Sequence, residues 1–169
     1  SQSFELYNII ARLNLSCSSA DRAGITFSTG TTNNYATVDE RMRIDETGKV
    51  GIGTTAPGSL LEVRGPTGTG AAGAGILTLS TAETTIVSGD VLGRINFQAP
   101  VEASGTDAIL SGASIHALAT DTFAADNNET ALVFSTASGD TEHGSATSGA
   151  LFERMRVTSA GNVGIGTTS

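Results

Sequence analysis

The stretch E-R-M-R-I-D-E-T-G-K-V-G-I-G-T-T-A-P, residues 40–57, returns near the end of the chain as E-R-M-R-V-T-S-A-G-N-V-G-I-G-T-T-S, residues 153–169. The two copies are offset by 113 residues without a gap, and they differ mainly in the middle. Self-similarity at a fixed spacing indicates an array of repeated units rather than a single enzyme pocket.

Each copy of this signature predicts a β-hairpin. In the first copy Met42 and Ile44 alternate with Arg41 and Arg43, so period two places the two pairs on opposite faces of a strand. The D-E-T-G segment that follows has turn chemistry, because Asp bonds nearby backbone and Gly tolerates positive φ. Apolar alternation then resumes, which predicts two strands joined by a four-residue loop.

The hairpin needs a partner surface, because two strands with a small apolar face are not stable alone. A neighbouring copy of the chain is the economical candidate. The residues predicted to pack between copies are Met42, Ile44, Val50, Ile52, Met155, Val157, Val163 and Ile165. Glycine inside a strand often marks the close approach of another backbone, and the glycines predicted to serve turns or close approach are Gly48, Gly51, Gly53, Gly161, Gly164 and Gly166.

The signature resembles the shaft repeats of viral tail fibres and tail spikes, which often lie upstream of an endosialidase-type intramolecular chaperone. The resemblance covers the two copies, about a fifth of the chain, and none of the present residues is assigned to that chaperone. It implies an all-β fold in the form of an elongated, intertwined homotrimeric β fibre, β-helix-like or β-prism-like. It also implies location in the virion, and the single cysteine, Cys17, fits assembly in a reducing host cytoplasm.

Composition suits a thin β architecture better than a thick globular core. The 169 residues include 21 Gly, six Phe, two Tyr and no Trp, and narrow repeat proteins complete their cores with neighbours. The net charge of −8 argues against nucleic acid, which requires a basic patch. A single cysteine, Cys17, allows no intrachain disulfide, and no apolar run is long enough for membrane insertion.

The chain divides into three parts by pattern. Residues 1–57 are predicted to be the C-terminal part of a first β repeat, and residues 76–169 a second, complete one. The repeat extends upstream of the signature, because I-T-F-S-T at 25–29 resembles L-V-F-S-T at 132–136. Strands are expected near residues 9–15, 24–29, 76–80, 91–98, 113–119 and 130–136. Residues 58–75 are predicted to be a Gly-rich connector, because they lack the Gly-Lys-Ser/Thr ending of a phosphate loop.

Catalysis and metal binding have only weak signals. Glycoside cleavage needs two carboxylates at a set separation, and the acids available by type are Asp121, Asp126, Glu129, Asp140 and Glu142. They lie in polar loops, where solvated acids are the ordinary finding. His116 on a predicted strand either faces solvent or meets its mates about a threefold axis, and His143 lies in a polar loop. We therefore expect no enzyme activity, no cofactor and no bound metal.

Two further functions stay open beside the structural fibre, a polysaccharide-degrading tail spike and a bacterial surface adhesin. In the fibre hypothesis the partners are other copies of the chain and other tail proteins, with a host surface glycan or protein bound through variable loops. Multivalent contact would then supply host attachment by avidity.

Overall fold

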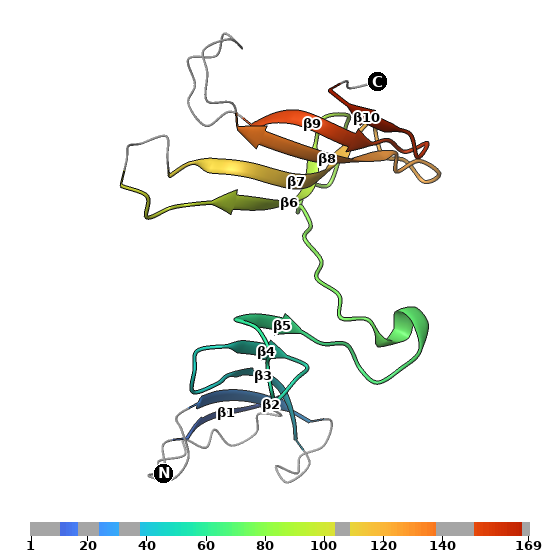
Figure 1. The fold of residues 1–169 in the computed structure, drawn as a ribbon. Coiled ribbons are helices and arrows are strands. Elements are labelled where there is room, and N and C mark those ends of the chain that lie inside the picture. Colours follow the sequence, from blue (N-terminus) through green and yellow to red (C-terminus); the bar gives the residue numbers. More distant parts are fainter. Residues whose placement is uncertain (1–10, 17–23, 31–37, 104–108, 138–150, 167–169) are drawn as a thin grey trace. The chain divides into compact units, whose positions relative to one another are not determined.

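A computed structural model describes residues 11–16 (backbone only), 24–30, 38–103, 109–137 and 151–166. Its described elements are β-strands and one short 3₁₀ helix, so the fold is all-β, as predicted (Figure 1). The chain separates into two compact units, Ser1–Thr78 and Leu79–Ser169, and each is described by itself.

The first unit holds a five-stranded sheet with the strands in sequence order. Neighbouring strands are antiparallel except for the last pair, β4 and β5, which is parallel. The strands are β1 (Ala11–Ser16), β2 (Gly24–Thr29), β3 (Asp39–Ile44), β4 (Val50–Ile52) and β5 (Leu61–Val63). The 3₁₀ helix η2 (Gly70–Gly73) follows β5.

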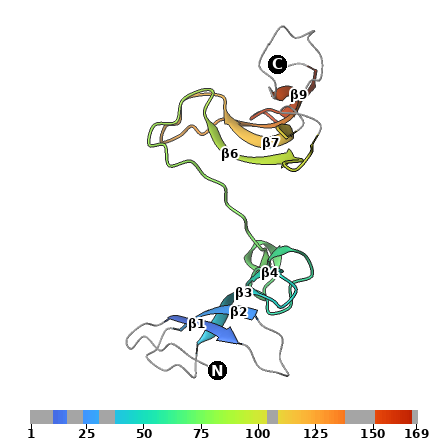
Figure 2. The ribbon, with the colours of Figure 1, turned by 90° about the vertical axis from the view of Figure 1, so that its left-hand side faces the viewer.

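The second unit holds a fully antiparallel five-stranded meander in the order β10-β9-β8-β7-β6 (Figures 1 and 2). Its strands are β6 (Val91–Gln98), β7 (Ser111–Ala119), β8 (Thr130–Ala137), β9 (Leu151–Val157) and β10 (Val163–Ile165). All five lie where alternation and the repeated signature predict strands.

The predicted repeat is also a repeat of strand pairing. In the first unit Phe27 of β2 lies opposite Met42, which lies opposite Ile52. The second unit has the same register through Phe134, Met155 and Ile165. Strands β2-β3-β4 therefore correspond to β8-β9-β10. Among the described residues, β5 has no counterpart in the second unit and β6 has none in the first.

Both hairpins form at the predicted positions, with five residues (45–49 and 158–162) between their strands instead of the expected four-residue loop. The carboxylate of Asp45 accepts hydrogen bonds from the amides of Thr47 and Lys49 at 2.8 and 2.9 Å. In the second hairpin Thr158 replaces Asp45, and its hydroxyl accepts from the amide of Asn162 at 3.1 Å.

Two expectations were wrong. Residues 76–80 do not form a strand, although their apolar pattern favours one. Arg41 and Arg43 do not share a face either, because each E-R-M-R box contains a β-bulge. The bulge inserts one extra residue into the strand and changes the alternation at that point.

Candidate functional site: the apolar faces of the two sheets

Continuous rows of apolar side chains cross one face of the second sheet. In one row residues lie opposite each other on all five strands, from β6 to β10. A second row runs beside it, and Phe97 of β6 extends the face along the strand. The first row is Ile95, Ile115, Phe134, Met155 and Ile165; the second is Gly93, Ala117, Leu132, Val157 and Val163.

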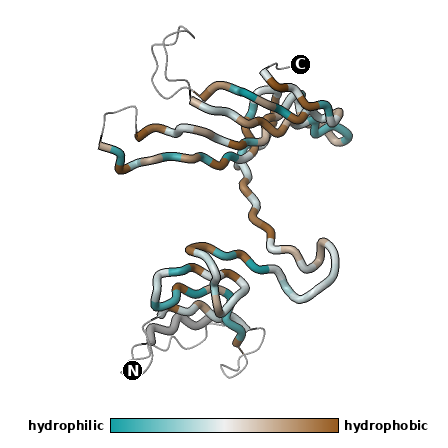
Figure 3. The backbone as a smooth tube through the Cα atoms, viewed as in Figure 1, coloured by the Kyte–Doolittle hydropathy of each residue, from teal (hydrophilic) through white to brown (hydrophobic). Residues whose placement is uncertain are grey.

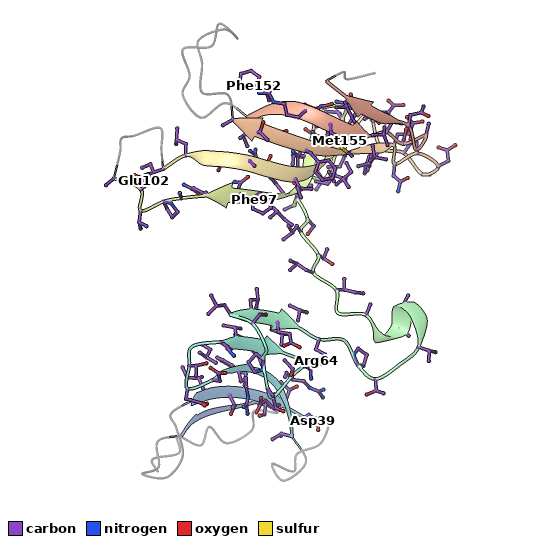
Figure 4. The ribbon with its side chains drawn as sticks, viewed as in Figure 1. Asp39, Arg64, Phe97, Glu102, Phe152 and Met155 are labelled. Atoms are coloured by element: carbon purple, nitrogen blue, oxygen red, sulfur yellow. The ribbon has the colours of Figure 1, made fainter. Side chains whose placement is uncertain are left out.

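This apolar face is largely open to solvent. Ile165 is 77% exposed and Phe97 is 52% exposed, although both are large hydrophobic residues. Ile95, Leu132 and Val163 are exposed as well. Figure 4 labels Phe97 on β6 and Met155 on β9, and the tube in Figure 3 shows hydrophobic and hydrophilic residues alternating along these strands. A contiguous apolar surface of this kind marks an interaction site in a soluble protein.

The first sheet has matching rows. The strand register aligns Phe27, Met42, Ile52 and Val63 in one row, and Ile25, Ile44, Val50 and Leu61 in the next. Phe27, Ile52 and Leu61 are exposed. All eight residues predicted to pack between copies therefore lie in these rows.

The opposite face of the second sheet contains most of the best-buried residues, although Ala119, at 1% exposed, alternates with Ile115 and Ala117 on the apolar face. Val133 is 1% exposed, and Ser114 and Ser135 on the neighbouring row are buried too. Val133 is flanked across the sheet by His116 and Arg156. The unit thus packs its small and polar face internally and leaves its large apolar residues outward. This arrangement is the reverse of an ordinary half-buried antiparallel sheet, whose buried face is the apolar one.

The bulge allows an ion pair to form within each E-R-M-R box, on the polar face of the sheet. The extra residue places Glu153 and Arg156, three positions apart, on the same face, where the guanidinium donates two hydrogen bonds to the carboxylate at 2.6 and 2.7 Å. Glu40 and Arg43 form the same pair at 2.6 and 2.8 Å. Such two-point pairs are strong and directional. In both units the carboxylate hydrogen bond raises the pKa of the arginine.

The other arginine of each box bonds on the apolar side of the strand. Arg41 donates to the hydroxyl of Thr29 at 3.2 Å and pairs with Asp39 at 3.0 Å. Arg154 donates to Thr136 at 3.0 Å, and its guanidinium lies 5.7 Å from the centre of the Phe152 ring. The four arginines thus have hydrogen-bond partners within the chain.

The repeated glycines have two distinct roles. Gly48, Gly53, Gly161 and Gly166 have φ between +68° and +84°, a backbone region that favours glycine. Gly51 and Gly164 are instead buried on the polar face. A Cβ on Gly51 would lie 2.7 Å from the carbonyl oxygen of Thr54, because the chain after β4 crosses back over it.

This crossing is held by the basic residues of the first hairpin. Arg43 donates to the carbonyl of Thr55 at 2.6 Å and Lys49 to that of Pro57 at 3.3 Å. The crossing segment then leads into β5, which completes the edge of the sheet beside β4.

The candidate catalytic and metal residues do not form a site where the structure describes them. Asp121 accepts hydrogen bonds from Thr122 and Asn127, and Asp126 and Glu129 are exposed in the same β7–β8 loop. Searched over the described ranges, no group of three His, Cys, Asp or Glu residues is placed to hold a metal. The remaining candidates, Asp140, Glu142, His143 and Cys17, lie outside the described residues.

His116 faces the buried polar side of the sheet, between Arg94 on β6 and Val133 on β8. Burial lowers the pKa of His116, and the charge of Arg94 lowers it further, while Glu153 opposes the change. Its Nδ1 and the Ser114 hydroxyl are buried without a hydrogen-bond partner in the described part of the chain.

The glycines of the connector also serve backbone contact. A Cβ on Gly68 would touch the backbone of Gly73 and Ala72, and Gly65 lies against the backbone of Ala74.

The described residues include no helix that is long and apolar enough to cross a membrane.

Sequence reasoning missed part of the apolar face. Phe27, Phe134, Ile95 and Phe97 were recognised as strand residues and not as members of an interaction surface. The I-T-F-S-T and L-V-F-S-T repeat was the available signal, because it carries the same Phe position into each row.

Comparison with known proteins gives limited similarity. No protein-family model matches the sequence, and no curated protein matches it. The structure of the carboxy-terminal domain of the bacteriophage T5 L-shaped tail fibre aligns over 94% of this chain and 72% of that one, with 14% identity and a TM-score of 0.39. The same domain with its intramolecular chaperone domain aligns over 94% of this chain and 50% of that one, with 14% identity and a TM-score of 0.40.

Proposed function

We propose that this chain is a structural segment of a viral tail fibre, and that the apolar faces of its sheets pack against other copies of the chain. The observation that carries the proposal is the apolar row in each unit, built by the repeated signature and exposed in the single chain. Exposed apolar area is unfavourable in water, at roughly 25 cal/mol per Å². Burial between copies removes that cost.

The proposed stoichiometry is three, as in the shaft repeats that the signature resembles, with the copies intertwined. In this assembly Met42, Ile44, Met155 and Val157 lie in the core between copies, and the variable loops face outward. The segment would belong to the virion and support attachment to the host surface, with avidity from repeated loops.

The first experiment is the mass of the protein in solution. Light scattering should give three times 17.0 kDa, and the assembly should resist detergent until heated. A folded monomer at micromolar concentration would refute the proposal. Release of oligosaccharides from host capsule or lipopolysaccharide would instead support a polysaccharide-degrading spike.

A matched pair of variants tests the surface itself. Ile165→Asp places a charge in the apolar row of the second sheet, and Val101→Asp makes the same kind of change at a residue that is 93% exposed outside the strands. Neither change buries a charge in the single chain. Ile165→Asp should weaken association by about 2 kcal/mol or more per copy, as at an interface hot spot, and Val101→Asp should leave the mass unchanged. Equal effects of the two variants would exclude this face from the interface.

A further inference from the structure

The apolar face of the second sheet carries a charged group beside its apolar rows. A third row of facing residues runs next to the two described above, and it consists of Phe97, Ala113, Thr136 and Phe152. Arg154 lies on the same side of the sheet, since its Nε donates to the hydroxyl of Thr136 at 3.0 Å and its guanidinium lies over the Phe152 ring. This charge therefore lies on the surface that the proposed function buries between copies.

In the first unit the equivalent arginine has an acidic partner within the chain. Arg41 donates from Nε to Thr29, and its Nη2 lies 3.0 Å from the carboxylate of Asp39. Asp39 lies opposite Thr29 in the sheet, and Phe152 has the corresponding position in the second unit (Figure 4). Both partners of Arg41 precede it in the chain, so this pairing does not depend on the residues that follow the hairpin.

The replacement of the aspartate by phenylalanine leaves Arg154 without the ion pair of its counterpart. In the part of the chain that the structure describes, no acceptor contacts its two terminal amino groups. The side chain is exposed in the single chain, so water solvates these groups. A guanidinium stays charged in proteins, and the transfer of a charge from water into an apolar interface is unfavourable unless the charge is paired.

We infer that the guanidinium of Arg154 in one copy binds a carboxylate of a second copy, which takes the place that Asp39 has beside Arg41. A carboxylate matches the planar fork of an arginine with two parallel hydrogen bonds. Each copy has 17 acidic residues against nine Lys and Arg residues, so carboxylates are in excess. The inference rests on the proposed self-association and specifies one contact within it. Such a pair would also fix the register between copies.

Carbodiimide coupling tests the contact, because this reagent joins an amine to a carboxylate that lies against it. Lys49 is the only lysine in the sequence, so Arg154→Lys adds a second one and keeps the positive charge. A bond between copies doubles the mass of the heated, denatured chain from 17.0 kDa, and peptide mass spectrometry identifies the joined residues. Arg41→Lys is the matched control, because its carboxylate partner, Asp39, belongs to the same chain.

Arg154→Lys should give at least about tenfold more doubled-mass product than the unsubstituted protein, because contact raises the effective concentration of the two groups. The additional bond should join position 154 of one copy to an acidic residue of another. Arg41→Lys should instead couple to Asp39 within one chain and give no such excess. Coupling of position 154 only within its own chain, or none there in an assembled protein, overturns the inference and leaves the proposed function standing. Failure of the unsubstituted protein to assemble overturns both.

The association strength of Arg154→Met provides a second measurement. Methionine removes the charge, so the inference leaves a carboxylate of the second copy unpaired in the interface. The apparent dissociation constant should then rise at least about thirtyfold. A guanidinium buried without a partner would give the opposite result, since loss of its charge would strengthen association. Thr136→Val removes only the bond within the chain and should change the constant far less. An unchanged or smaller constant for Arg154→Met would overturn the inference.

Discussion

Gly53→Ala should destabilise the first unit far more than a substitution at another left-handed glycine of the same hairpin. Gly53 ends β4 with φ +72°, and its amide donates to the carbonyl of Arg41 at 2.9 Å. A Cβ there would overlap the backbone carbonyl oxygen of Arg64, which follows β5. The overlap is with main chain, so no side-chain rotation relieves it.

Gly48→Ala is the matched control. Gly48 has φ +84° in the hairpin turn, but a Cβ on it would meet nothing within 4 Å. Its substitution should therefore cost only the left-handed conformation, about 1–2 kcal/mol. Gly53→Ala carries the same conformational cost and must also displace β5. Overpacking of this kind destabilises a protein by about 1–3 kcal/mol.

The assay is thermal unfolding of the two variants and the unsubstituted protein at one protein concentration, because association makes the midpoint depend on concentration. For a unit of this size about 1 kcal/mol corresponds to 4–8 °C, so Gly53→Ala should melt about 4–24 °C below Gly48→Ala. The Arg64 amide should also exchange its hydrogen faster in Gly53→Ala than in Gly48→Ala. Equal melting temperatures would refute the role of Gly53 in close backbone approach.

Three further predictions concern the turns, the polar face and the bulge. The Thr47 hydroxyl, with backbone amides, lowers the pKa of Asp45. The stabilisation from Asp45 is therefore present above the unfolded pKa of about 3.9 and lost as pH falls through the folded pKa. Amide exchange should rise in acid in this turn and not in the turn at Thr158, which uses a hydroxyl. The pKa of His116 is also lowered, so the stability of the second unit should fall as pH drops below about 6.5, and His116→Gln should flatten that dependence in a melting series. Arg154→Ala removes the guanidinium bond to the β8 threonine and should cost about 1 kcal/mol, with a Lys variant recovering only part of it in the same melts.

Local structure was predictable from the sequence. The two hairpins, their turn residues and most strands follow from period-two alternation, Asp and Gly turn chemistry and the exact repeat. The positions that form the apolar rows in β3, β4, β9 and β10 were predictable for the same reason, because the alternation is unbroken from Met42 to Ile44 and from Met155 to Val157, on one side of each bulge.

Long-range contacts were not predictable in the same way. The bulge in E-R-M-R depends on pairing with β2 or β8, since only the partner strand shows that Arg41 and Arg154 are extra residues. The identity of β5 as a parallel partner of β4 depends on the chain crossing back over Gly51.

The repeat, the all-β class and the apolar alternation of Glu40–Pro57 were thus determined by sequence alone, because they depend on neighbours along the chain. Only the tertiary structure decided that the small, polar face is the one packed within a unit and that the large apolar face stays open. The physical reason is that alternation separates two faces without saying which is covered. The covering residues, such as the Glu153–Arg156 pair around Val133, come together only when the whole sheet forms.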